Sequence, residues 1–377
     1  MKMMPQPWPG PLGAENAGRT PVVLALGGQV RWSIELPVRT LWYLLAAADN
    51  RWAAGGQNLI AGGDQQGVTW QRHEPCSPPA LQENGGSPGV AVARGAHGMA
   101  LLNLDDGSER WAREGFHAVV AAAGAAIASI AIGEHERSLV LLEPNGALRW
   151  SHPVDHPIGT PLAWENTIVF ASAHEVTAFS LGGKELWRAS PLGFGVPAAN
   201  KEDVLSTHPF ALDERRIAIG ARTGEWRGYL IVDPSEQSAD PWRLPNGAMV
   251  ADELPVAVRR IPPKPLAIIS HQLFRVGITA LDGTEVGDWP LPAAPSAFAV
   301  DPTGAVAVAY SLDATRHDKY LWHDEGRAVH GRSGITIFEP DGRPRWTWDA
   351  PGPLGGFAVN AAGEILVTSE GRLWAIG

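Results

Sequence analysis

The sequence contains a single cysteine, Cys76, in 377 residues. One cysteine excludes an intramolecular disulfide, and it excludes a zinc or iron–sulfur site built from several cysteines. Basic residues are also scarce, because 30 Lys and Arg face 40 Asp and Glu and leave a net charge of −10. The chain lacks the basic footprint of a protein that binds nucleic acid or an anionic membrane non-specifically. We therefore expect no nucleic-acid partner.

Long apolar segments are missing as well. Nowhere do roughly 18 apolar residues run together, as a membrane-spanning helix requires. The N-terminus, MKMMPQPWPGPLG, has no apolar run of signal-peptide length. With Met1 as the native start, these absences predict a cytoplasmic protein without a membrane span.

Tyrosine is rare, with 4 residues, whereas tryptophan (16), glycine (43) and proline (32) are abundant. Glycine and proline both disfavour the interior of a helix. This composition therefore favours many short strands and tight turns over long helices. Apolar residues make up 45% of the chain and are sufficient for a core.

Two stretches of the chain are close copies of each other. Ser138–Trp150 reads SLVLLEPNGALRW, and Gly334–Trp346 reads GITIFEPDGRPRW. In both, apolar residues lead to an acid-Pro pair, an Asn-Gly or Asp-Gly follows, and a short strand ends on Trp. Asn-Gly and Asp-Gly tolerate the positive φ angles of a type I′ turn, so each copy predicts a β-hairpin.

Further copies of this hairpin recur along the chain at a period of about 40 residues, which is the length of one four-stranded propeller blade. Five copies share the spacing Gly-x-x-x-Trp, and three degenerate copies fill the gaps between them. The repeated tryptophans are Trp32, Trp70, Trp111, Trp150, Trp187, Trp242, Trp289 and Trp346.

The repeat predicts an all-β fold, a β-propeller of eight four-stranded blades. Phe357–Gly377 supplies only three strands, and Gln29–Glu35 has too little sequence before it to complete a blade alone. We expect these segments to pair and close the ring, which leaves no open sheet edge. Seven blades are the alternative, because Pro37–Trp70 makes a poor blade and Val22–Leu26 competes with RLWAIG for the third-strand position.

The predicted domain organisation is simple. Residues 1–21 are rich in Pro and Gly and form an extended arm, and residues 22–377 form one propeller. Asp313–Ser333 interrupts the repeat and is predicted to be an insertion at the rim, where long loops of propellers carry binding.

The hairpin pattern resembles the repeat of the pyrroloquinoline-quinone-like (quinoprotein-like) β-propellers, a superfamily that includes quinoprotein alcohol dehydrogenases and the β-propeller lipoprotein of outer-membrane protein assembly. Trp8-Pro9 followed by Arg19-Thr20-Pro21 is similar to the short arm that often opens these propellers. The resemblance implies that the eight repeated tryptophans dock each blade onto its neighbour. Seven other tryptophans do not occupy the repeated position and are favoured as exposed residues that could contact a partner: Trp42, Trp52, Trp164, Trp226, Trp322, Trp348 and Trp374.

The enzymes of that superfamily resemble one another in an adjacent cysteine pair beside the quinone, and one cysteine cannot supply it. No local match exists for their catalytic Asp or their metal-binding Glu and Asn, and this chain is substantially shorter. We therefore predict no cofactor and no catalytic residues, and fold analogy alone does not carry an activity.

The insertion holds the candidate contact residues. His317, His323 and His330 are candidate metal ligands, but their separations of six and seven residues match no tight ligand spacing, so a solvated loop is favoured over a metal site. The residues favoured for contact with a partner are Tyr320, Trp322, His323 and Arg327.

The leading hypothesis is a non-catalytic scaffold, monomeric by itself, that binds a protein or peptide partner through rim loops. The loops concerned are Asp313–Ser333 and the Pro-rich segment Pro241–Pro265. The alternative is a quinone- or sugar-binding propeller, enzyme or lectin-like, that uses the central funnel. A third possibility is a scaffold for envelope assembly, against which stand the missing signal peptide and the missing N-terminal cysteine.

Overall fold

The computed structural model is a β-propeller, and its described residues contain strands and no helix. It follows that no helix in this part of the chain is long and apolar enough to cross a membrane. The structure describes residues 22–39, 41–47, 50–56, 58–74, 80–82, 88–94, 98–123, 126–132, 137–154, 161–164, 166–171, 175–189, 204–205, 210–211, 217–223, 226–233, 238–243, 258–260, 266–270, 275–279, 285–292, 295–310 and 333–377.

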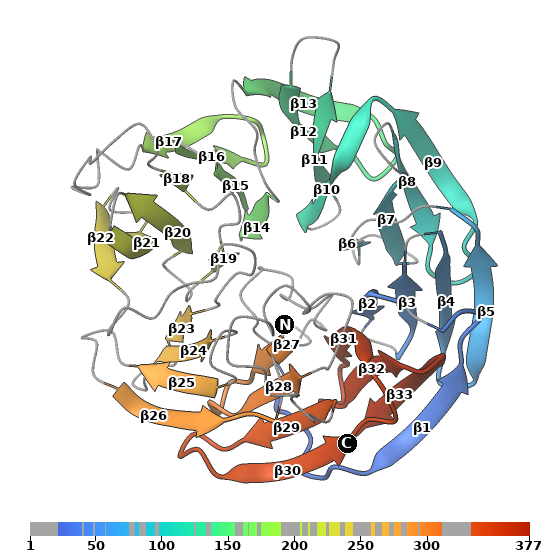
Figure 1. The fold of residues 1–377 in the computed structure, drawn as a ribbon. Coiled ribbons are helices and arrows are strands. Elements are labelled where there is room, and N and C mark those ends of the chain that lie inside the picture. Colours follow the sequence, from blue (N-terminus) through green and yellow to red (C-terminus); the bar gives the residue numbers. More distant parts are fainter. Residues whose placement is uncertain are drawn as a thin grey trace, which may run out of the picture.

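The strands form eight antiparallel sheets that follow one another around a ring (Figure 1). The first sheet contains β2 (Tyr43–Ala46), β3 (Trp52–Gly55), β4 (Ile60–Asp64) and β5 (Gly67–Arg72). The second contains β6 (Ala80–Gln82), β7 (Gly89–Ala93), β8 (Gly98–Asn103) and β9 (Glu109–Glu114). The third contains β10 (Phe116–Ala123), β11 (Ala126–Ile132), β12 (Arg137–Leu142) and β13 (Leu148–Val154).

The fourth sheet contains β14 (Leu162–Trp164), β15 (Thr167–Ala171), β16 (Val176–Ser180) and β17 (Glu185–Ala189). The fifth contains β18 (Val204–Leu205), β19 (Phe210–Ala211), β20 (Ile217–Thr223), β21 (Trp226–Asp233) and β22 (Ser238–Arg243), and both β18 and β19 pair with β20. The sixth contains β23 (Val258–Arg260), β24 (Leu266–Ser270), β25 (Arg275–Thr279) and β26 (Glu285–Pro290).

The seventh sheet contains β27 (Pro295–Val300), β28 (Val306–Tyr310), β29 (Gly334–Phe338) and β30 (Pro344–Asp349). The eighth, which we call the closing sheet, joins the two ends of the chain: β31 (Leu354–Val359), β32 (Ile365–Ser369) and β33 (Arg372–Ile376) are followed by β1 (Val30–Glu35). In Figure 1, blue β1 lies along the outer side of red β33.

The predicted pairing of the chain ends is confirmed. In the antiparallel pair β1 and β33, Ser33 lies opposite Trp374 and Glu35 lies opposite Arg372. The third strand is therefore RLWAIG. Val22–Leu26 is not a strand, and the first sheet is complete, so the seven-blade alternative is wrong.

The segment before β1 fastens the ring in a second way. The amide of Leu24 donates to the buried carboxylate of Asp301 at 3.0 Å, and the amide of Ala25 donates to the carbonyl of Gly363 at 3.0 Å. Leu24 is buried in a core cluster that contains residues of both the seventh sheet and the closing sheet. Residues 22–25 thus bridge the last two blades before the chain enters β1.

The hairpins form, but the predicted type I′ turn is wrong, because only the glycine of each Asn-Gly or Asp-Gly pair has a positive φ and a β-bulge follows the turn. In the copy at Ser138–Trp150, the amides of Glu143 and Gly146 are bonded within the turn and Gly146 has a φ of 80°. Gly342 in the other copy has a φ of 88°. Each core cluster fills the space between two successive sheets, because the middle strands are buried on both faces.

The predicted arm at residues 1–21 and most of the predicted insertion lie outside the residues that the structure describes. Of Asp313–Ser333, only Ser333 is described. Of Pro241–Pro265, the description covers residues 241–243 and 258–260.

Candidate functional site

A tryptophan of the outer strand reaches the next sheet at four described interfaces. Its indole Nε1 donates to a backbone carbonyl in or beside the neighbouring turn. The four bonds join Trp70 to Leu104 at 2.7 Å, Trp111 to Pro144 at 2.9 Å, Trp150 to Leu181 at 3.1 Å and Trp346 to Ala25 at 3.0 Å. The fourth bond crosses the point of ring closure.

Each of these rings lies against a glycine, which accounts for the Gly-x-x-x-Trp spacing. A Cβ added to the glycine would come within 2.5 to 2.9 Å of the ring, so no larger residue fits without a shift. The pairs are Gly107 with Trp70, Gly146 with Trp111, Gly183 with Trp150 and Gly28 with Trp346. The hairpins of Trp111 and Trp150 therefore each offer a glycine to the preceding blade and a tryptophan to the following one.

For the other four repeated tryptophans, the structure does not describe a complete docking contact. Trp32 is partly buried against the cluster between the closing sheet and the first sheet. Trp187 is buried, and its indole nitrogen has no acceptor within the described part of the chain. Trp242 and Trp289 lie on β22 and β26, and their side chains fall outside the description.

Adjacent glycines in one turn provide a matched test of this contact. Gly183 has a φ of 84°, and its added Cβ would meet Trp150 at 2.8 Å, whereas that of Gly182 would meet only Ser180 Oγ at 3.7 Å. Left-handed backbone and overpacking each cost about 1–2 kcal/mol. We expect Gly183→Ala to lower the free energy of unfolding in urea by about 2–3 kcal/mol and Gly182→Ala to change it by less than about 0.5 kcal/mol. Equal effects would show that Trp150 does not need the glycine.

Ion pairs reinforce the same turns. The carboxylate of Glu339 accepts from Nε and Nη2 of Arg345 at 2.7 and 3.1 Å, and these bonds hold the pKa of Glu339 below its usual value. Arg345 also donates to the carbonyl of Leu24 at 2.9 Å. Glu143 and Arg149 repeat the bidentate pair at 2.6 and 2.7 Å, again with a lowered pKa of the glutamate. These contacts are structural and fix the hairpins.

The repeat breaks at the interface of the seventh and closing sheets, where two further tryptophans meet. Trp348 of β30 and Trp374 of β33 have ring centroids 5.8 Å apart and ring planes inclined by 50°. Both are partly buried against the core and partly exposed. We call them the tryptophan pair.

The register shows that Trp374 is an unusual residue for its position. Ala375 lies opposite Trp32 in the closing sheet, and Ile337 lies opposite Trp346 in the seventh sheet, so Ala375 and Ile337 occupy equivalent positions. The residues before them, Trp374 and Thr336, are therefore equivalent as well. The same position in the first four sheets and the seventh holds a small or aliphatic residue that is buried: Ala61, Ala100, Val140, Thr177 and Thr336. An indole at this position is partly exposed and has no counterpart in these sheets.

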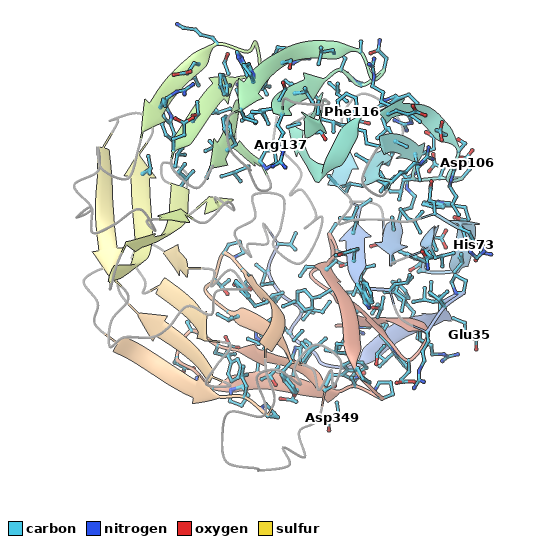
Figure 2. The ribbon with its side chains drawn as sticks, turned by 45° about the horizontal axis from the view of Figure 1, so that its top comes forward. Glu35, His73, Asp106, Phe116, Arg137 and Asp349 are labelled. Carbon is cyan, nitrogen blue, oxygen red and sulfur yellow. The ribbon has the colours of Figure 1, made fainter. Side chains whose placement is uncertain are left out.

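Charged side chains border the tryptophan pair. The guanidinium of Arg372 lies 5.8 Å from the centroid of the Trp374 ring and 3.1 Å from Oε1 of Glu35 on β1. The side chain of Glu35 is 81% exposed, and Asp349, which follows Trp348, is also exposed. Glu35 and Asp349 both lie on the outer perimeter of the ring (Figure 2).

This surface adjoins the base of the insertion. Tyr310 and Gly334, on β28 and β29, lie opposite each other at its two ends, and the amide of Ala350 donates to the carbonyl of Ser333 at 2.9 Å. The residues proposed for binding lie in the insertion outside the described residues: His317, Tyr320, Trp322, His323, Arg327 and His330.

The seven tryptophans outside the repeated positions were expected to be exposed, and this expectation is wrong for one of them. Trp52 is fully buried, and its Nε1 donates to the carbonyl of Asp64 at 3.0 Å. Trp42 is 38% exposed. The side chains of Trp164, Trp226 and Trp322 are not covered by the description. Trp52 projects into the core because it lies on an inner strand rather than in a loop.

The described residues hold no group of three or more His, Cys, Asp and Glu side chains arranged for a metal ion. Sequence reasoning missed Arg372 and Glu35 and the meeting of Trp348 with Trp374. A signal for this meeting was present in the sequence: neither Trp348 nor Trp374 occupies a repeated tryptophan position, and both lie in strands close to the point where the ring closes.

No family model and no curated protein matches the sequence. Solved structures are similar to it in fold. BamB from Moraxella catarrhalis has a TM-score of 0.60 at 13% identity over 92% of this chain and 97% of its own. A europium-containing methanol dehydrogenase has a TM-score of 0.58 at 10% identity over 97% and 89%. These structures share the β-propeller fold of this chain.

A third similar structure is Sqt1 from Saccharomyces cerevisiae, with a TM-score of 0.56 at 11% identity over 93% of this chain and 95% of its own. These identities are too low to carry an activity, so a function for this propeller has to be argued from its own residues.

Proposed function

We propose that this quinoprotein-like propeller is a non-catalytic scaffold that binds a protein or peptide partner at its outer rim. The binding surface combines the tryptophan pair and Arg372 with the adjoining insertion Asp313–Ser333. Tryptophan and arginine are the side chains most enriched among residues that dominate binding energy at protein interfaces.

The observation that carries the proposal is the break in the repeat at Trp374. Partial exposure of two large rings leaves apolar area in contact with water, and a partner that covers them gains the free energy of that burial. The insertion leaves the sheet beside the same rings, and long rim loops are where propellers hold binding residues.

The test is quantitative recovery of interacting proteins on immobilised full-length chain. The double variant Trp348→Ala/Trp374→Ala and a variant with residues 313–332 replaced by a short Gly-Ser linker are compared with the wild type. Loss of two interface residues at more than 1.4 kcal/mol in total lowers affinity at least tenfold. We expect recovery of a specific partner to fall by that factor in both variants.

Trp42→Ala is the matched control, because it removes an indole that is 38% exposed and directly precedes β2 of the first sheet. It should recover the partner in wild-type amounts. Thermal unfolding of every variant shows whether the propeller is intact. Equal recovery by the wild type and by both folded rim variants would disprove the proposal.

A further inference from the structure

We infer that two copies of this chain associate through the outer edge of the closing sheet. In this arrangement β1 of one copy pairs antiparallel with β1 of the other, and a two-fold axis passes beside Ser33. The two closing sheets then form one continuous sheet across the dimer. The inference does not depend on partner binding at the tryptophan pair, and it differs from the monomer expected from the sequence.

The outer edge of β1 is free to pair. Within the described residues β1 pairs only with β33, and in Figure 1 it runs along the outside of the ring with no strand beyond it. The amide of Leu36 donates to the carbonyl of Gly371 at 2.8 Å, and residues of an antiparallel strand turn alternately toward and away from their neighbour. Ser33 and Glu35 therefore direct their backbone N–H and C=O groups outward. An unpaired row of this kind is a template for another strand.

The sequence of β1 is complementary to itself in this arrangement. The two-fold axis beside Ser33 places the residues before it opposite the residues after it in the second copy. Arg31 faces Glu35 of the second copy, Trp32 faces Ile34, and each of these pairs occurs twice. Opposite charges and aromatic–aliphatic neighbours are cross-strand pairs that stabilise antiparallel sheets. The ladder with β33 is regular from Trp32 to Glu35 and shifts before Trp32, so Arg31 contributes through its long side chain.

Arg31 lacks the acid that its counterparts hold. In the third and seventh sheets, the arginine before the repeated tryptophan pairs with a glutamate of its own hairpin. The pairs are Arg149 with Glu143 and Arg345 with Glu339. In the closing sheet the two chain ends replace that hairpin, and Arg31 is exposed without an acidic partner in the described part of the chain. Oε1 of Glu35 accepts from Arg372, but the side chain is 81% exposed and a carboxylate has further acceptor sites for Arg31 of the second copy.

An uncharged apolar stretch extends the surface beside β1. Residues 20–30 contain no charged side chain. Val23, Leu26 and Val30 are three of the six large apolar side chains that are exposed among the described residues. Each copy carries a net charge of −10, so two copies approach most favourably where charge is absent or complementary. A two-fold axis brings the same patch of both copies together.

The other outer strands are less suited to pairing with themselves. Four of them contain a proline, which removes a backbone donor from the edge. They are β13 with Pro153, β22 with Pro241, β26 with Pro290 and β30 with Pro344. In β17, Glu185 and Arg188 already pair at 2.9 Å, and their odd separation prevents a two-fold axis from placing them opposite each other. Arg72 is the one charged residue of β5, and Glu109 of β9 is held by Arg94 at 2.7 Å.

The inference is tested by analytical ultracentrifugation of the full-length chain over a range of concentrations. We expect a reversible equilibrium between monomer and dimer. Arg31→Glu and Glu35→Arg each place like charges opposite each other twice, so each should weaken dimerisation at least tenfold. The two variants mixed in equal amounts should form a heterodimer, because the charges across their edges are complementary again. The double variant Arg31→Glu/Glu35→Arg should dimerise like the wild type for the same reason.

Arg113→Glu is the matched control, because it reverses an exposed arginine on the outer strand β9 and should leave the equilibrium unchanged. Thermal unfolding shows whether each variant is folded. Glu35→Arg also loses the pair with Arg372, so recovery of the dimer on mixing decides the question. A wild type that stays monomeric at every concentration, a dimer that neither single variant weakens, or folded variants that do not recover on mixing would each overturn the inference. The proposed binding of a partner at the tryptophan pair would stand in all three cases.

Discussion

Removal of residues 1–35 is expected to abolish the single cooperative unfolding transition and to make the protein aggregate. This deletion takes away β1 and exposes the edge of β33, and an unpaired edge is a template for association between chains. It also takes Leu24 from the core between the last two blades and removes the hydrogen bond that the Leu24 amide donates to Oδ2 of Asp301. Circular dichroism and light scattering during thermal unfolding measure the result.

Removal of residues 1–21 alone is the matched control, because the closure contacts described above begin at Val22. This shorter chain should unfold in one transition at the wild-type temperature. A synthetic peptide of residues 22–35 should restore the transition of the longer deletion when it is added in excess, since it supplies the missing strand. A sharp, unshifted transition in the chain lacking residues 1–35 would contradict closure by β1.

Among the tryptophans whose side chains the structure describes, Trp52 should be the most damaging to replace by alanine. The side chain is fully buried between the closing sheet and the first sheet, so its removal leaves a large cavity and an unsatisfied carbonyl at Asp64. Loss of a buried Trp costs about 3–5 kcal/mol. We expect the free energy of unfolding in urea to fall by that amount.

Trp42→Ala is again the comparison, because Trp42 lies ten residues before Trp52 but is 38% exposed. Its substitution should cost about 1 kcal/mol or less. If the two variants have the same midpoint and slope in urea, Trp52 does not occupy the core position assigned to it.

The sequence predicted the blades well because their signals are local. The Asn145-Gly146 and Asp341-Gly342 turns fix the hairpins through backbone conformation, and the short third strand at Arg372 implied a missing partner at Val30. Turn chemistry acts over a few residues and can be recognised without knowing the fold. The burial of Trp52 could not be predicted in this way, because an off-repeat position says nothing about which face of the strand is covered.

The candidate site consists of residues that are far apart in the sequence and meet only in the folded chain. Arg372 and Glu35 are 337 residues apart, and they meet because β1 closes the ring. Trp348 and Trp374 come from different sheets, so the angle between their rings follows from blade packing. The insertion was recognised because it interrupts the repeat, and the structure adds that it leaves the sheet beside this pair.

The most direct test of the proposed binding surface is site-specific photo-crosslinking in cells. A benzoylphenylalanine at Asp349, beside the tryptophan pair, should give a discrete crosslinked adduct with the partner. The same group at Leu148, which is 53% exposed on β13 in the third sheet, should give none. An adduct at Leu148 without one at Asp349 would contradict the account and place the partner on another part of the ring.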